Sequence, residues 1–145
     1  MKKSFCIFES FFLPITNIMK RSFSFRKRLQ SFVYAFKGIR YALGNEHNVW
    51  IHTLAACLVI LAALYFNIER WEWCFLALSI GMVFCAELLN TSIEILIDLL
   101  HPEQHPKVGL LKDVAAGGVL CAAIGAAAVG LLIFGPRILN LITDF

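Results

Sequence analysis

Residues 49–66 read VWIHTLAACLVILAALYF, a continuous apolar run that carries no formal charge. A helix rises about 1.5 Å per residue, so a run of this length crosses most of a hydrocarbon layer roughly 30 Å thick. The chain of 145 residues is 59% hydrophobic with a mean hydropathy of +0.74, more apolar surface than one soluble core of this size can bury. The sequence therefore predicts an all-α integral membrane protein whose first span covers residues 49–66.

Two further spans follow the first. Residues 71–100 form an apolar segment without a helix breaker, and Pro102 ends it because proline lacks the amide that a helix interior needs. Residues 113–134 form the third apolar segment, which we expect Gly135 and Pro136 to stop. The sequence thus predicts three transmembrane helices.

An amphipathic segment precedes the spans. Residues 26–45, RKRLQSFVYAFKGIRYALGN, repeat apolar side chains every three or four positions, while basic side chains occupy the other face. This pattern is typical of a helix that lies on the membrane surface. We expect residues 1–25 to form an interfacial or disordered extension, in which Met19 is an alternative start, and residues 26–145 to form one membrane domain.

Basic residues are distributed unevenly around the predicted spans. Lys107 and Lys112 lie between spans two and three, whereas Arg70 and Arg137 lie on the opposite side of the membrane. Nine more precede the first span: Lys2, Lys3, Lys20, Arg21, Arg26, Lys27, Arg28, Lys37 and Arg40. By the positive-inside rule the amino terminus and the segment 101–112 are cytoplasmic, and the carboxyl terminus lies outside. The predicted location is the plasma (inner) membrane, crossed several times.

The second span carries a row of polar side chains. Its last sixteen residues, 85–100, read CAELLNTSIEILIDLL, and positions i, i+3, i+4, i+7 and i+11 of one helix face are Glu87, Asn90, Thr91, Glu94 and Asp98. A carboxylate inside a membrane costs several kcal/mol unless it is solvated, paired or bound to metal, so such a row indicates a functional site. The alternative is that Glu87 pairs with a basic residue of a neighbouring helix, while Glu94 and Asp98 are ordinary solvated charges.

Further charged residues stand at a similar depth. Glu46 precedes the first span, and Lys112 and Asp113 lie at the cytoplasmic mouth of the third. Packing three spans together would bring Glu46, Glu94 and Asp113 into one interfacial layer. Carboxylate and amide oxygens suit Mg²⁺, and an adjacent lysine suits phosphate. We therefore expect a nucleotide and its Mg²⁺ to bind at the cytoplasmic surface, with Glu87 slightly deeper to accept the proton of a lipid hydroxyl.

The sequence contains none of the motifs of soluble kinases. There is no Walker A sequence, no kinase glycine-rich loop, and no HRD or DFG signature. The usual soluble kinase folds are therefore excluded, and the predicted reaction is phosphoryl transfer across a membrane interface.

At these residues the sequence resembles the prokaryotic diacylglycerol kinase and undecaprenol kinase family of small trimeric membrane enzymes. The matching blocks are FKGIRYALGNEHN, AELLNTSIEILIDLL and HPEQHPKVGLLKDVAAGGVL. The resemblance implies a homotrimer that uses ATP and Mg²⁺, with Glu87 as catalytic base, Asn90 in the catalytic cluster, and Glu46 and Glu94 as metal-linked acids. Nucleotide contacts would fall on Tyr34, Glu103, Gln104, His105, Lys112 and Asp113.

The acceptor lipid is predicted from two short stretches. NEHNVWIH, with Asn48 and His52, and the VAAG opening of the third span look more like the undecaprenol branch of the family. The expected activity is phosphorylation of undecaprenol to undecaprenyl phosphate, and the alternative is diacylglycerol to phosphatidate. A non-enzymatic membrane subunit or small transporter is an alternative of another class. An ion path requires charges through a whole span, yet the first and third spans carry none within the bilayer.

Overall fold

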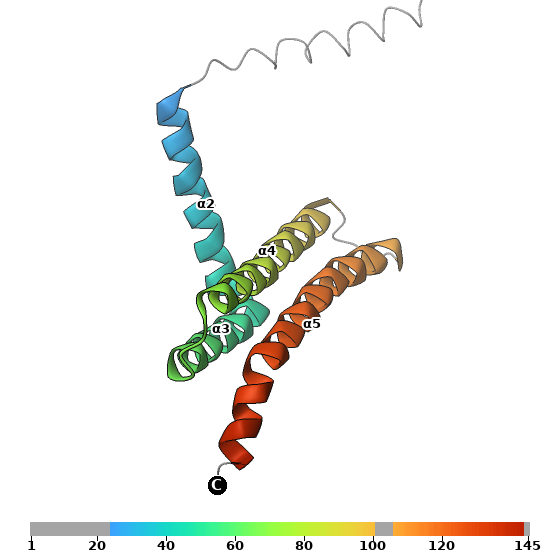
Figure 1. Cartoon of the computed structure of the whole chain (residues 1–145). Helices are drawn as coiled ribbons and strands as arrows, with labels where there is room; N and C mark the ends of the chain where they lie inside the picture. Colours follow the sequence, from blue (N-terminus) through green and yellow to red (C-terminus); the bar gives the residue numbers. More distant parts are fainter. Residues whose placement is uncertain (1–23, 101–105, 144–145) are drawn as a thin grey trace, which may run out of the picture. The chain divides into compact units, whose positions relative to one another are not determined.

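The computed structural model describes residues 24–100 and 106–143. In those ranges the chain folds into helices α2 (Phe25–Asn45), α3 (His47–Tyr65), α4 (Arg70–Leu100) and α5 (Pro106–Thr143), as Figure 1 shows, and it forms no strand. Helices α3, α4 and α5 are each long and apolar enough to cross a membrane. The predicted all-α class and the three membrane helices are confirmed.

The chain divides into two units, residues 1–37 and residues 38–145. The described part of the first unit is the start of α2. Its apolar side chains Phe25, Leu29 and Phe32 are exposed, as an amphipathic helix on a lipid surface requires. The second unit holds the end of α2 and the three membrane helices. The surface location of α2 stays a prediction.

The third membrane helix extends beyond the predicted span at both ends. Helix α5 begins at Pro106 rather than near Asp113, because proline with its fixed φ is well accommodated in the first turn of a helix. It also continues through Pro136 to Thr143, so the prediction that Gly135 and Pro136 stop the helix was wrong. Proline removes one helical hydrogen bond, and here that loss does not end the helix.

The connection between α3 and α4 is a complete Schellman motif. Asn67 adopts a φ of 48°, a left-handed conformation that asparagine tolerates better than most residues. The amide of Asn67 donates to the carbonyl of Leu64, and the amide of Ile68 donates to the carbonyl of Ala63. Ala63 and Ile68 are both buried, which is the apolar contact that accompanies this motif. The turn therefore fixes how the chain leaves α3 and enters α4.

Helix α4 supplies the centre of the second unit. It packs along α5 and also against α3, and Figure 1 shows α4 and α5 side by side. The hydrophobic core lies where α3 ends and α4 begins, against the second half of α5, and consists of Ala63, Ile68, Leu76, Ile133 and Phe134. The buried residues of α4 recur every three or four positions from Glu72 through Leu76, Ser79 and Val83 to Glu87, so one face of this helix points inward along its length.

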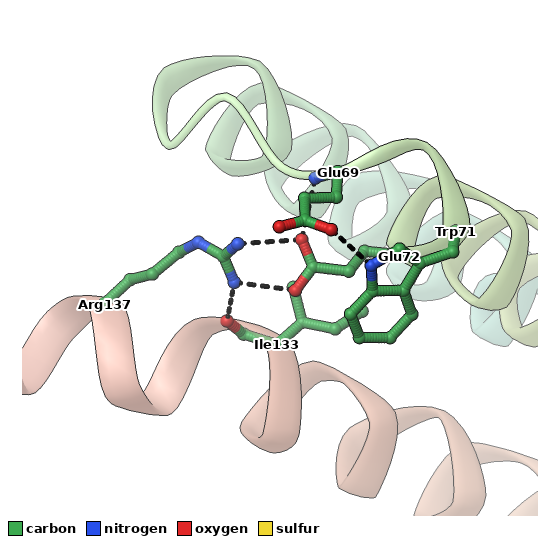
Figure 2. A network of polar contacts seen from close by, with 5 residues as sticks. All are labelled: Glu69, Trp71, Glu72, Ile133 and Arg137. Atoms are coloured by element: carbon green, nitrogen blue, oxygen red, sulfur yellow. Dashed lines mark hydrogen bonds and ion pairs between the residues drawn. The ribbon is translucent and has the colours of Figure 1, made fainter.

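A polar network fastens the start of α4 to α5 (Figure 2). The two terminal guanidinium nitrogens of Arg137, Nη1 and Nη2, donate to Oε1 and Oε2 of Glu72 at 2.9 and 2.7 Å. Arg137 also donates to the carbonyl of Ile133. The same Glu72 accepts the backbone amide of Glu69 at 2.8 Å, which satisfies one of the free amides at the start of α4. The pairing explains why α5 stays ordered beyond Pro136: its next residue is bonded to another helix.

Replacing Arg137 by glutamine should lower the apparent melting temperature of the detergent-solubilised protein by several degrees. The substitution leaves the Glu72 carboxylate, whose side chain is 7% exposed, without its cation. The matched control is Arg70→Gln, because Arg70 is exposed at the first position of α4. Equal melting temperatures for the two variants would show that the Glu72–Arg137 pair contributes nothing to stability.

Candidate active site

The polar row predicted on the second span lies on the inward face of α4. Glu87, Asn90 and Thr91 are 2%, 7% and 4% exposed, and they continue the buried stripe that begins in the core. Each has a buried side-chain atom without a hydrogen-bond partner: Oε1 of Glu87, Oδ1 of Asn90 and Oγ1 of Thr91. Buried polar atoms are normally paired. Oε1 of Glu87 faces the imidazole of His52, so the two remaining oxygens without a partner, on Asn90 and Thr91, indicate a place that receives a polar ligand.

Glu87 faces a histidine of the first span. Nε2 of His52 on α3 lies 3.0 Å from Oε1 of Glu87, an ion-pair distance without the alignment of a hydrogen bond. His52 is part-exposed, whereas the side chain of Glu87 is almost wholly buried. Glu46 and Glu94 are close enough for their charges to act on Glu87. The carboxylate therefore sits among two acids and one imidazole, which gives it the surroundings of a group that exchanges a proton.

Asn90 and Glu94 are bonded to each other. The side-chain amide of Asn90 donates to Oε1 of Glu94 at 2.8 Å, one helical turn further along α4. This bond turns the oxygen of the Asn90 side chain away from Glu94 and leaves it without a partner. The pair thus presents a carboxylate and an amide oxygen to a ligand from one helix.

Glu46 occupies the N-cap position of α3. Its backbone is extended, with φ of −100° and ψ of 118°, and its side chain makes no capping hydrogen bond. A residue at this position normally uses its side-chain oxygen to satisfy the free amides of the first turn. Because Glu46 does not, its carboxylate is available for another partner.

The start of α5 is bonded to the end of α4. Nζ of Lys112 lies 2.6 Å from Oδ1 of Asp98, and the charge of Glu94 also acts on Lys112. Asp113 is exposed on the next position of α5. The predicted phosphate-binding lysine therefore stands near the predicted metal-binding acid, in the same part of the second unit.

A cavity of about 530 Å³ opens between α3, α4 and α5. His52 is the first residue of α3 to line it, and Phe134 lies among its lining residues on α5. Apart from His52 and Ser79, the lining residues are apolar. The group that contacts Glu87 is thus also part of the wall of an apolar cavity.

Four predicted site residues do not enter this description of the second unit. Glu103, Gln104 and His105 lie outside the described residues. Tyr34 belongs to the first unit, where its exposed ring has its centroid 5.6 Å from Nζ of Lys37. The nucleotide contacts expected at these positions stay predictions.

Sequence reasoning missed the roles of His52 and Asp98. His52 was singled out as a mark of the undecaprenol branch, not as the contact of Glu87, and Asp98 was one member of the polar row rather than the partner of Lys112. The sequence did offer one indication of the His52 contact. His52 is a polar residue in an otherwise apolar span, and it lies within a few helical turns of the same membrane surface as Glu87.

A comparison with protein families gives a match to the family described as prokaryotic diacylglycerol kinase, over residues 33–134. The chain belongs to this family. The matched range includes α3, α4 and most of α5, and therefore every described residue of the candidate site. The protein is accordingly a membrane lipid kinase, and kinase activity implies ATP as the phosphoryl donor.

Some relatives of this kinase are named for undecaprenol and others for diacylglycerol. Undecaprenol kinase of Bacillus subtilis (strain 168) is 39% identical over 109 residues, which cover 75% of this chain and 89% of the relative. Diacylglycerol kinase of Synechocystis sp. (strain ATCC 27184 / PCC 6803 / Kazusa) is 40% identical over 114 residues, 78% of this chain and 65% of the relative. Diacylglycerol kinase of Escherichia coli (strain K12) is 29% identical over 102 residues, 70% of this chain and 84% of the relative.

The donor set of the kinase fits a metal ion that arrives with its nucleotide. Within residues 24–100 and 106–143, no three His, Cys, Asp or Glu side chains form a metal-binding cluster. Mg²⁺ is commonly held by one or two carboxylates together with substrate phosphates. Glu46 and Glu94 are two carboxylates that both lie close enough to Glu87 for their charges to act on it. The bonded pair of Asn90 and Glu94 adds a hard oxygen donor without a partner.

Proposed function

We propose that the protein transfers the γ-phosphoryl group of Mg²⁺-ATP to undecaprenol at the cytoplasmic interface, with Glu87 as the general base. The observation that carries the proposal is the buried carboxylate of Glu87, which lies against His52, a residue that lines an apolar cavity. A lipid alcohol needs an apolar site for its chain and a base for its hydroxyl, and these two features meet there.

The proposed chemistry assigns one task to each group. Glu87 accepts the proton of the acceptor hydroxyl as the new oxygen–phosphorus bond forms and the bond to the leaving ADP breaks. Glu46 and Glu94 hold Mg²⁺, which when bound neutralises charge on the phosphates. Lys112, kept in place by Asp98, offers a cation to the nucleotide phosphates. Asn90 fixes the carboxylate of Glu94 and presents its own oxygen.

Undecaprenol is the preferred acceptor for two reasons. The undecaprenol kinase from Bacillus subtilis is 39% identical over 89% of its length, whereas the diacylglycerol kinase from Escherichia coli is 29% identical over 84% of its length and that from Synechocystis is 40% identical over 65% of its length. The start of α3, NEHNVWIH, also carries His52, which contacts the proposed base. Undecaprenyl phosphate is then the product, and phosphatidate is the product if diacylglycerol is the true acceptor.

A phosphorylation assay with two acceptors tests the proposed function. The purified protein in bicelles receives Mg²⁺-ATP with undecaprenol, with diacylglycerol, and with both in competition. We expect undecaprenol to be phosphorylated with the higher kcat/KM. Preference for diacylglycerol would overturn the assignment of undecaprenol as acceptor but not the proposed phosphoryl transfer. Transfer to neither lipid would favour a non-enzymatic membrane subunit or small transporter.

We also propose a homotrimer with its amino terminus and active site on the cytoplasmic side of the plasma membrane and its carboxyl terminus outside. Large apolar side chains on all three membrane helices are exposed, including Leu58, Leu78 and Leu132, so lipid or neighbouring subunits must cover them. The basic residues before α3 and at the start of α5 support this orientation. The mass of the solubilised protein and labelling of its cysteines from each side of the membrane test these two points.

A further inference from the structure

His52 lies between an apolar cavity and the buried carboxylate of Glu87. Its ring lines the apolar cavity between α3, α4 and α5, and its Nε2 atom lies 3.0 Å from Oε1 of Glu87. The side chain of His52 is 24% exposed, whereas that of Glu87 is 3% exposed. His52 is therefore the residue that joins the lining of the apolar cavity to the buried carboxylate of Glu87.

The carboxylate of Glu87 needs such a neighbour. A buried carboxylate inside a membrane protein is costly unless a donor or a cation stabilises its ionised form. Glu46 and Glu94 are both acids, so neither supplies a positive charge to Glu87. His52 comes from a different helix and is the ion-pair partner that the described structure gives to Glu87. An imidazole nitrogen 3.0 Å from the carboxylate would offset part of the cost and fix the orientation of its oxygens.

We propose that His52 is a positioning residue for Glu87, which holds the carboxylate ionised and directed at the acceptor hydroxyl. This inference rests on the proposed function, because it requires Glu87 to be the base. His52 itself exchanges no proton with the substrate. Its contribution is expected in the turnover number and not in the affinity for Mg²⁺-ATP, since the contact joins α3 to the base and not to the nucleotide groups.

Two substitutions of His52 separate positioning from packing. Leucine fills the space of the ring but has no donor, whereas glutamine places an amide N–H close to the position of Nε2. We expect His52→Leu to lower kcat by about 100-fold with KM for ATP changed by less than about 2-fold, because general-base catalysis contributes on the order of 10²–10⁴-fold. We expect the kcat of His52→Gln to be at least about 10-fold higher than that of His52→Leu. His47→Gln is the matched control, because His47 is an exposed histidine on the same helix.

The experiment uses the full chain in bicelles, with Mg²⁺-ATP and whichever of undecaprenol or diacylglycerol the unaltered protein phosphorylates. A His52→Leu variant with kcat within about 2-fold of the unaltered protein overturns the proposal. If the leucine variant fails to fold, His52→Gln decides: normal KM for ATP with kcat reduced between about 2-fold and 10-fold supports positioning, and an unchanged kcat or a rise in KM alone overturns it.

A double variant distinguishes this inference from the proposed function on which it rests. If His52 acts through Glu87, adding His52→Leu to Glu87→Gln lowers kcat no further, because the two residues act as a unit. Independent, multiplicative losses would overturn the positioning role. Full activity of Glu87→Gln alone would instead refute the base itself, whereas loss in Glu87→Gln with normal His52→Leu would refute the positioning role alone.

Discussion

Replacing Glu87 by glutamine should reduce kcat about 1000-fold while leaving the protein folded and, if anything, more resistant to heat. Glutamine has nearly the same shape as glutamate but cannot accept a proton, so the acceptor hydroxyl loses its base. The same change removes a charge from a side chain that is 3% exposed within a membrane helix, which relieves a desolvation cost. Activity and stability are therefore expected to move in opposite directions, a result that simple structural damage does not produce.

The measurement compares initial rates and melting curves of Glu87→Gln with those of Glu72→Gln. Glu72 is a second buried carboxylate of α4, but it lies at the other end of the helix and pairs with Arg137. The Glu72 variant should lose stability and keep most of its kcat. Unreduced turnover in Glu87→Gln would show that another group takes the proton, and a Glu87 variant of altered mass in detergent would indicate a structural role in assembly.

Local pattern was sufficient to predict the membrane helices. The first span, predicted at residues 49–66, lies at His47–Tyr65, and the second, predicted at residues 71–100, lies at Arg70–Leu100. Apolar runs of this length have few alternatives to a spanning helix, because the backbone must satisfy its own hydrogen bonds in lipid. The end of the third helix was predicted wrongly because a local rule was applied to a tertiary situation. Proline ends helices in isolation, but Arg137 is bonded to Glu72, 65 residues away.

The candidate site was predictable to the extent that it lies on one helix. Glu87, Asn90 and Thr91 share a face because of helical spacing, and all three are buried on α4. The contact between His52 and Glu87 joins two helices, so it depends on how far each is rotated about its axis. The spacing of residues along the sequence does not specify how far each helix is rotated. The pairing of Lys112 with Asp98 was hidden for the same reason, since it depends on how α5 returns along α4.

Replacing Glu94 by glutamine should raise the Mg²⁺ concentration needed for half-maximal activity by about 10-fold and lower kcat/KM for ATP by about 100-fold. Glu94 is proposed to hold Mg²⁺ together with Glu46, and a neutral amide is a much weaker ligand for this ion than a carboxylate. The glutamine side chain can still accept the hydrogen bond that Asn90 donates at 2.8 Å, so the local structure should persist. A Mg²⁺ titration at fixed ATP, repeated at fixed Mg²⁺ with varied ATP, measures both quantities.

The cycle of Glu46→Gln, Glu94→Gln and the double variant tests whether the two carboxylates share one ion. Residues that bind a common ligand give losses that do not add, so the double variant should be closer to the worse single variant than to the sum of both. Glu69→Gln is the control, since Glu69 is an exposed acid that accepts a bond from Trp71 far from the site. An unchanged Mg²⁺ requirement in Glu94→Gln would remove this residue from the metal site. Additive losses would place Glu46 and Glu94 at separate positions and leave the nucleotide phosphates, rather than a pair of carboxylates, as the main ligands of the ion.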